Sequence, residues 1–339
     1  MLEIKDLHQS YFYGTNALNG ISFVLNDGEK LAVLSKNGGG KTSLLKCIAG
    51  LFPSSSGSII LDGKDITNLK VKDRGLRMVY DDGGLIRNRS VSFNLTYPLK
   101  LRKFPKSERL GIAYQTAKDY GLEAFFKEQA FRLFTPEIIA LALARLELRD
   151  SPLTLIDDVF SIANGKERKD LFDKFLSKIS HLKGNVIFAT DSVEEAFSFS
   201  DKVLVLNNGY QDQIGTLEEL KSNPQTLLVD EFVNPNKNRI LCGVVDNVVE
   251  IDGLKLKIAS DYQSNEVFVS YELTENISGY QFDCSYKKYI AENKYVFVNN
   301  AGEKFVGERC SNDTKVSIDV NSLKLFDRIN EKLLTYELL

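Results

Sequence analysis

The most informative segment of this 339-residue chain is Ser35-Lys36-Asn37-Gly38-Gly39-Gly40-Lys41-Thr42-Ser43. Apolar residues 31–34 precede it, and apolar positions at helical spacing follow at Leu44 and Ile48. A strand, a glycine loop, a Lys-Thr pair and a helix form the layout of a phosphate-binding loop. Glycines let backbone N–H groups curl around an anion, and the helix points the positive end of its dipole at the same place. We therefore expect Lys41 to reach the β- and γ-phosphates of a nucleotide and Thr42 to ligate Mg²⁺.

The loop departs from the strict pattern at one position, because Ser35 stands where a glycine is usual. Kinases, GTPases and many ATPases share such a loop, so it does not define the reaction by itself. We expect Ser35, Asn37 and the run from Gly38 to Ser43 to contact the nucleotide.

Composition narrows the class of protein. A length of 339 residues predicts two domains, and 43% hydrophobic with 26% charged residues is typical of an ordinary soluble protein. A net charge of −3 argues against a general nucleic-acid binder, and two histidines exclude a histidine-rich metal site. The four cysteines are far apart in sequence, which fits a reducing cytosol. Because no apolar run approaches the roughly 20 residues of a membrane span, we expect any link to a membrane to pass through partner subunits.

The first two thirds of the chain predict an α/β fold. Short strands are expected at 2–7, 20–25, 30–34 and 58–61, a helical region over 107–149, and two apolar strands at 153–156 and 186–189. The helical region has apolar spacing at Leu110, Tyr114 and Ala117, and later at Ile138, Leu141, Ala142 and, through its aliphatic stem, Arg145. Apolar strands that alternate with helices indicate a mostly parallel sheet covered on both faces.

The last third predicts a separate β domain. A polar linker at 234–238 is followed by alternating apolar positions over 254–258, 267–271 and 316–320, with turn signals at 252–253 and 299–302. This pattern is typical of a small barrel or sandwich of about 100 residues. We therefore predict domains at 1–233, with a helical subdomain at about 100–150, and at 234–339.

A second acidic motif supports a metal-dependent nucleotide site. Residues 153–158 form a mostly apolar strand that ends in Asp157 and Asp158. In this position Asp157 would hold Mg²⁺ through water, opposite Thr42. Two acids can also simply end a strand at a turn, but their place downstream of the glycine loop favours the metal site.

The order and spacing of these motifs over residues 1–230 resemble the ATP-binding subunits of ABC transporters. The matching segments are an aromatic loop at Ser10-Tyr11, a Q-loop at 78–85, a signature-helix tail at 142–145, a switch region at 190–196 and closing strands at 203–209 and 214–216. The resemblance implies a P-loop NTPase fold, ATP and Mg²⁺ as ligands, and membrane-spanning transporter subunits as partners. It also implies that Tyr11 stacks on adenine.

Two finer likenesses point to different substrates. Residues 83–85 with 93–99 are similar to ATPases of the lipid-transporting Mla/Mce type. Residues 240–339 resemble the TOBE domain of import ATPases, an OB-like β domain, most clearly at 316–319 and 323–327.

Several family motifs are altered in this chain. The Q-loop glutamine is Asp81, which could still bind Mg²⁺. The signature reads Leu133-Phe134-Thr135-Pro136-Glu137, in which Phe134 has no hydroxyl and Pro136 has no N–H for a phosphate. Asp158 replaces the catalytic glutamate with a shorter arm, and Asp191 replaces the switch histidine and removes a hydrogen-bond donor. We interpret the signature segment as a helix start with Thr135 as the N-cap.

Groups that grip a nucleotide therefore persist, whereas groups that sense or cleave the γ-phosphate are altered. We expect an ATP-binding subunit that binds Mg-ATP, forms a homodimer or a heterodimer with a second such subunit, and drives or gates its membrane partners with weak hydrolysis. The alternative is a catalytically inactive pseudo-ATPase with a structural or regulatory role, so whether the chain is an enzyme stays open. A small-molecule kinase fits less well because the full register matches the transporter family. We expect a cytoplasmic protein, peripheral at the inner face of the cell membrane, with no nucleic-acid partner.

Overall fold

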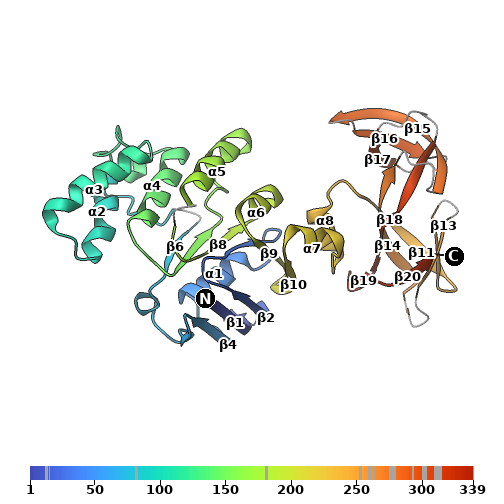
Figure 1. Cartoon of the computed structure of the whole chain (residues 1–339), viewed down its shortest axis with the longest axis horizontal. Coiled ribbons are helices and arrows are strands. Elements are labelled where there is room, and N and C mark those ends of the chain that lie inside the picture. The colour runs from blue at the N-terminus through green and yellow to red at the C-terminus, as the bar shows by residue number, and fades with distance from the viewer. Residues whose placement is uncertain are drawn as a thin grey trace. The chain divides into compact units, whose positions relative to one another are not determined.

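The computed structural model describes residues 1–11, 14, 16–80, 83–179, 182–251, 254–258, 262, 264–274, 280–291, 294–299, 304–308 and 315–338, and it describes no side chains within 273–317. The chain divides into two compact units, residues 1–217 and 218–339 (Figure 1). In the described part, no helix is long and apolar enough to cross a membrane.

The first unit contains two sheets. The smaller one is antiparallel, with the order β2-β1-β4-β5, and comprises β1 (Leu2–Ser10), β2 (Asn16–Leu25), β4 (Ser56–Leu61) and β5 (Lys64–Asp65). The larger one has the order β10-β9-β3-β8-β7-β6 and comprises β3 (Lys30–Leu34), β6 (Arg77–Val79), β7 (Leu153–Asp157), β8 (Asn185–Thr190), β9 (Lys202–Asn207) and β10 (Tyr210–Gly215). All neighbouring strands of the larger sheet are parallel except β9 and β10, which confirms the predicted mostly parallel sheet.

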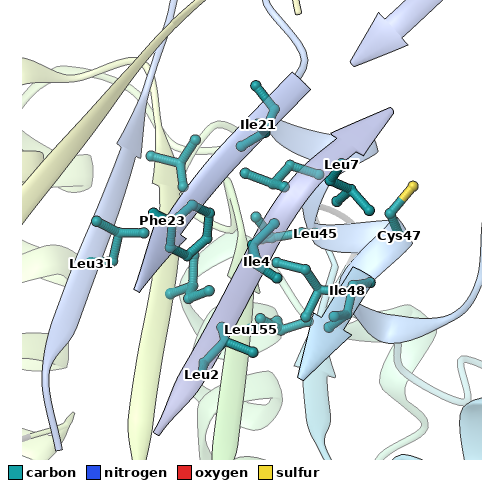
Figure 2. Packing of buried hydrophobic residues seen from close by; sticks show 14 of the residues in the cluster. Leu2, Ile4, Leu7, Ile21, Phe23, Leu31, Leu45, Cys47, Ile48 and Leu155 are labelled. Atoms are coloured by element: carbon teal, nitrogen blue, oxygen red, sulfur yellow. The ribbon is translucent and has the colours of Figure 1, made fainter. Parts of the chain in front are cut away.

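Helix α1 (Lys41–Ala49) lies between the two sheets and supplies the centre of the main core. Figure 2 shows its side chains Leu45, Cys47 and Ile48 packed with residues of both sheets, among them Ile4 of β1 and Leu155 of β7. All of these side chains are buried. The helix that follows the glycine loop is therefore fixed from two sides, which fixes the loop in turn.

The opposite face of the larger sheet is covered by α5 (Gly165–Ile179) and α6 (Val193–Phe199) (Figure 1). Successive residues of β8 divide between the faces: Ile187 packs in the core with α1, whereas Phe188 packs in an aromatic cluster with helix residues. The cluster consists of Phe160, Phe172, Phe175, Phe188 and Phe199. Because both faces of β8 are covered, successive residues are all buried, and the strand is a continuous apolar run in the sequence.

The helical part of the first unit includes the predicted helical region over 107–149. It comprises the helices α2 (Val91–Leu101), α3 (Lys106–Asp119) and α4 (Thr135–Glu147), with short 3₁₀ turns at Val71–Asp73 and Ala130–Arg132. A turn follows α3 because Gly121 adopts a left-handed φ of +69°. The predicted face of α3 is only partly right, because Ala117 is buried as expected, together with Ala113, whereas Leu110 and Tyr114 are exposed.

The start of α4 corrects a second prediction. The N-cap is Phe134 rather than Thr135, because Phe134 has extended backbone angles and Thr135 is already helical. The Glu137 carboxylate accepts a hydrogen bond from the Phe134 N–H at 3.1 Å. The helix start is therefore capped by its own third residue instead of by a threonine hydroxyl.

The second unit is an antiparallel β region preceded by the short helices α7 (Leu217–Ser222) and α8 (Leu227–Val233). Its sheet has the order β17-β16-β15-β18-β14-β11-β12-β13-β20, with β19 beside β18. The strands are β11 (Asn238–Val245), β12 (Val248–Ile251), β13 (Leu254–Ile258), β14 (Glu266–Thr274), β15 (Tyr280–Ala291), β16 (Lys294–Asn299), β17 (Lys304–Glu308), β18 (Lys315–Asp327), β19 (Leu333–Leu334) and β20 (Tyr336–Leu338). This confirms the predicted all-β region and is consistent with an OB-like domain.

The alternation predicted for this region is present in its core. The apolar positions of 254–258 and 267–271 are buried, and so is Ile318. The side chain of Val316 lies outside the described part, as do the predicted turns at 252–253 and 300–302.

Residues 234–238, the predicted linker, are anchored in the second unit. Asp230 of α8 is fully buried and pairs with Arg239 at 2.8 Å, and the Ser270 hydroxyl donates to the same carboxylate at 2.6 Å. The Lys237 ammonium donates to the Ser322 carbonyl at 2.9 Å. The domain boundary at 233 and 234 stays a prediction, and the compact units offer a competing division between Leu217 and Glu218.

Limited trypsin digestion of the full chain distinguishes the two divisions. We expect the first cut after Lys221, because it is exposed and Lys237 is held by its hydrogen bond. Mass spectrometry of the fragments identifies the site. A first cut after Lys237 instead would support the boundary at 233 and 234, and cuts scattered through 218–338 would argue against a separable β unit.

The aromatic cluster gives a stability prediction. Replacing the fully buried Phe188 by alanine should lower the free energy of unfolding by about 3–5 kcal/mol, because the change leaves a cavity between β8 and its covering helices. Urea unfolding followed by circular dichroism measures the loss. Phe131→Ala is the matched control, since Phe131 is 57% exposed and its loss should cost less than about 0.5 kcal/mol. Equal effects of the two changes would contradict the packing described.

Candidate nucleotide-binding site

The glycine loop joins the end of β3 to the start of α1 at Lys41. A Cβ on Gly39 would lie 2.6 Å from the Ser35 hydroxyl, and one on Gly40 would lie 3.0 Å from the Ala17 carbonyl. Gly40 also has a left-handed φ of +108°. The loop therefore requires glycine at Gly39 for space and at Gly40 for both space and backbone angle.

Lys41 lies inside the loop. Its ammonium donates to the Ser35 carbonyl at 2.8 Å, to the Ser35 hydroxyl at 3.2 Å and to the Lys36 carbonyl at 3.4 Å. Burial lowers the pKa of Lys41, and nearby carboxylates act in the opposite direction. The loop thus holds a cation at its centre with its main-chain groups arranged around it.

A cavity of about 570 Å³ opens over this loop. Its wall includes most of the predicted site residues: Tyr11, Asn37, Gly38, Gly39, Gly40, Lys41, Thr42, Ser43 and Asp158. Ser35 is fully buried and does not line the cavity, but its carbonyl accepts a hydrogen bond from Lys41. Asp81, predicted to contact nucleotide and Mg²⁺, lies outside the described residues.

The structure adds Asn16, Ala17 and Asn208 to the cavity wall, and sequence reasoning missed all three. The turn between β9 and β10 packs against the loop, where the Gly209 N–H donates to the Gly39 carbonyl at 3.0 Å. No local pattern predicts this contact, because the partners are far apart in sequence.

Tyr11 lies at one side of the cavity. Its hydroxyl is 2.8 Å from the Ser43 hydroxyl, and its ring meets Phe52 edge-on with 5.9 Å between ring centroids. Tyr11 is 43% exposed, so part of the residue is accessible to a ligand. Stacking of this ring on adenine remains a prediction.

Thr42 and Asp157 come together as predicted. The Thr42 hydroxyl donates to Asp157 Oδ1 at 3.0 Å, although the residues are on different elements, α1 and β7. Asp157 is 1% exposed. Hydroxyl and carboxylate oxygens are the donors that Mg²⁺ prefers, so this pair fits a magnesium ion beside the phosphate loop.

Asp158 is the carboxylate of the cavity wall. It has a left-handed φ of +45°, and its Oδ1 atom is buried with no hydrogen-bond partner in the part of the chain that is described. Burial raises the pKa of Asp158 to about 6, and the carboxylate of Asp191 acts in the same direction.

Asp191, the second predicted catalytic residue, is not among the residues that line the cavity. Its carboxylate accepts a hydrogen bond from Arg168 Nη2 at 2.9 Å, and Arg168 also forms two hydrogen bonds with Glu195. Sequence reasoning assigned no role to Arg168. The pairing brings a cation to the acidic edge of the site, by which we mean Asp157, Asp158 and Asp191 at the ends of β7 and β8.

Among the described residues that line this cavity, none belongs to the predicted signature segment at 133–137. Phe134 is 74% exposed at the start of α4. In place of a hydroxyl, this surface presents an aromatic ring.

Comparison with known proteins identifies relatives of this chain in sequence and in fold. The family model described as ABC transporter matches residues 18–161. The sn-glycerol-3-phosphate import ATP-binding protein UgpC of Yersinia enterocolitica is 30% identical over 72% of this chain and 67% of its own length. The spermidine/putrescine import ATP-binding protein PotA of Pasteurella multocida is 26% identical over 92% of this chain and 90% of its own length. Among solved structures, cbiO1 from Clostridium perfringens matches with a TM-score of 0.57 and 23% identity over 65% of this chain and 89% of that chain.

Because Tyr11 lines the cavity and is partly exposed, its substitution tests the site. Tyr11→Ala should weaken Mg-ATP binding by about 1–3 kcal/mol if the ring stacks on adenine. Titration calorimetry on the full chain measures the change. Tyr114→Ala is the control, because Tyr114 is also 43% exposed but belongs to α3 and not to the cavity. Unchanged affinity in Tyr11→Ala would remove this residue from the site.

Proposed function

Because this chain belongs to the family of ABC transporter ATP-binding proteins, we propose that it is the ATP-binding subunit of an importer. In this proposal it binds Mg-ATP in the cavity over Lys41 and dimerises with itself or with a second such subunit. Dimerisation drives or gates membrane-spanning partners at the cytoplasmic face of the cell membrane.

One observation supports the proposed nucleotide site above the others. It is the hydrogen bond from Thr42 to Asp157 beside the loop that surrounds Lys41. With ATP present, Lys41 would turn from the loop carbonyls to the phosphates, and Thr42 and Asp157 would hold Mg²⁺, with Asp81 as a further ligand. Bound Mg²⁺ would neutralise phosphate charge. Tyr11 would orient the base, and Ser43 would anchor Tyr11 through their hydroxyl contact.

The direction of transport is proposed from the relatives. UgpC and PotA are both import ATP-binding proteins, and the match to PotA extends over 92% of this chain, so it includes most of the second unit. A TOBE-like role for residues 234–339 is consistent with this. The likeness of 83–85 and 93–99 to lipid-transporting ATPases is the weaker hint, and lipid transport is the second candidate.

We further propose that hydrolysis is weak. Asp158 has a side chain one methylene shorter than glutamate, and a misplacement of about 1 Å can cost roughly 100-fold in rate. Asp191 cannot donate to a phosphate, and its carboxylate is engaged by Arg168. In the opposite half-site of a dimer, Phe134 would offer no hydroxyl and Pro136 would offer no N–H. A pseudo-ATPase remains the alternative, favoured by the exposed ring of Phe134.

Repair of the altered residues tests weak hydrolysis. The double change Asp158→Glu with Asp191→His should raise ATP turnover, because it restores the reach of the base and a hydrogen-bond donor. Adding Phe134→Ser and Pro136→Gly should raise turnover further by rebuilding the facing half-site. Phosphate release under single-turnover conditions measures each step, and Lys41→Ala in the repaired protein should abolish the signal.

Two outcomes would decide against the proposal. Wild-type turnover of about 1–10 per second, near ordinary enzyme rates, would contradict weak hydrolysis. Repaired protein that binds Mg-ATP but neither dimerises nor hydrolyses it would favour the pseudo-ATPase.

A further inference from the structure

Position 191 presents an electrostatic problem. A carboxylate there adds negative charge at the edge where the γ-phosphate of ATP would lie under the proposed function. Asp157 and Asp158 already bring two carboxylates to the neighbouring strand end, β7. Lys41 is the cation of the loop. Besides Lys41 and a bound Mg²⁺, a further cation at this edge would offset the charge of Asp191.

Arg168 is that cation, and it is held rigidly. Its Nε atom is 2.5 Å from Glu195 Oε1, and its Nη2 atom is 3.0 Å from Glu195 Oε2. The Thr190 hydroxyl lies 3.3 Å from Nη2 and donates to Glu195 at 2.5 Å. Arg168 and Glu195 are on α5 and α6, so two helices fix the guanidinium at the end of β8.

Besides Glu195, two further carboxylates lie near the same nitrogen atom of Arg168. Arg168 Nη2 is 2.9 Å from Asp191 Oδ1 and 3.9 Å from Asp158 Oδ1. The first distance is a hydrogen bond and the second is not. Asp158 Oδ1 is also the buried atom without a hydrogen-bond partner, and Asp158 lines the cavity. The guanidinium thus lies directly behind the cavity wall, with Asp191 occupying its donor.

A carboxylate and a phosphate present similar oxygens to a guanidinium, and arginine binds both in the same geometry. We propose that Asp191 is an internal substitute for the γ-phosphate, and that Arg168 is the residue by which this site distinguishes ATP from ADP. When ATP binds, its γ-phosphate takes the Arg168 donor from Asp191. This inference rests on the proposed nucleotide site and assigns the donor that an aspartate at position 191 cannot supply.

The test is a double-mutant cycle on nucleotide preference. Titration calorimetry on the full chain gives dissociation constants for Mg-ADP and for the Mg²⁺ complex of a non-hydrolysable β,γ-imido analogue of ATP. Arg168→Gln should lower the preference for the triphosphate by about tenfold, the size of one charge-assisted hydrogen bond. Asp191→Asn should raise the preference, because a neutral amide releases the guanidinium more easily.

The coupling between the two changes decides between mechanisms. If Asp191 only repels phosphate, Asp191→Asn raises the preference equally with Arg168 or with glutamine at position 168. If Asp191 competes for Arg168, the gain disappears in the double variant. An additive cycle, or an unchanged preference in Arg168→Gln, overturns the proposal.

Controls separate this role from folding. Arg168→Lys keeps the charge but not the planar fork, so it should retain part of the preference and provides an answer if Arg168→Gln does not fold. Arg239→Gln breaks the buried pair with Asp230 in the second unit and should lower thermal stability without changing the preference. If wild-type protein binds neither nucleotide, the proposed function fails along with this inference. If it binds both and the cycle is additive, only the inference fails.

Discussion

The enclosure of the Lys41 ammonium by the carbonyls of its own loop is the contact on which the rest of the first unit depends. Three hydrogen bonds to Ser35 and Lys36 hold the cation in place. They require a loop that curves tightly at the end of β3, and that curvature leaves no space for side chains at Gly39 and Gly40. The helix α1 must then start at Lys41, and the two sheets pack around this helix. The cation fixed in this way lies in the wall of the cavity, where we propose that the phosphates bind.

Local sequence patterns predicted this centre well. The strand before the loop, the loop and α1 follow each other directly, and the buried strands β7 and β8 are short apolar runs that no exposed segment would tolerate. The pair of Thr42 and Asp157 was also predicted, because the ends of parallel strands meet at one edge of a sheet. Tyr11 and Asp158 were placed correctly at the cavity, although the roles assigned to them are untested.

Predictions failed where distant or subtle contacts decide the structure. Apolar spacing at Leu110, Tyr114 and Ala117 suggested one buried face, but α3 buries the small residues Ala113 and Ala117 and exposes the two larger side chains. The contact of Gly209 with the glycine loop and the pairing of Arg168 with Asp191 join segments that only the folded chain brings together. Asp191 read by itself is a missing donor, and its pairing with Arg168 becomes visible only in the folded chain.

The close approach of Gly209 to the glycine loop separates two kinds of position in the site. A Cβ on Gly209 would lie 2.5 Å from the Ala17 carbonyl, and one on Gly40 would lie 3.3 Å from the Gly209 Cα atom. The main chains of three segments, those at Ala17, Gly40 and Gly209, are therefore in close contact. A side chain at either glycine would force these segments apart. The acidic edge is built from side chains, which can be exchanged one at a time without moving the backbone. Mutations can thus change the side chains at the acidic edge while the backbone of the glycine loop, the proposed phosphate site, stays unchanged.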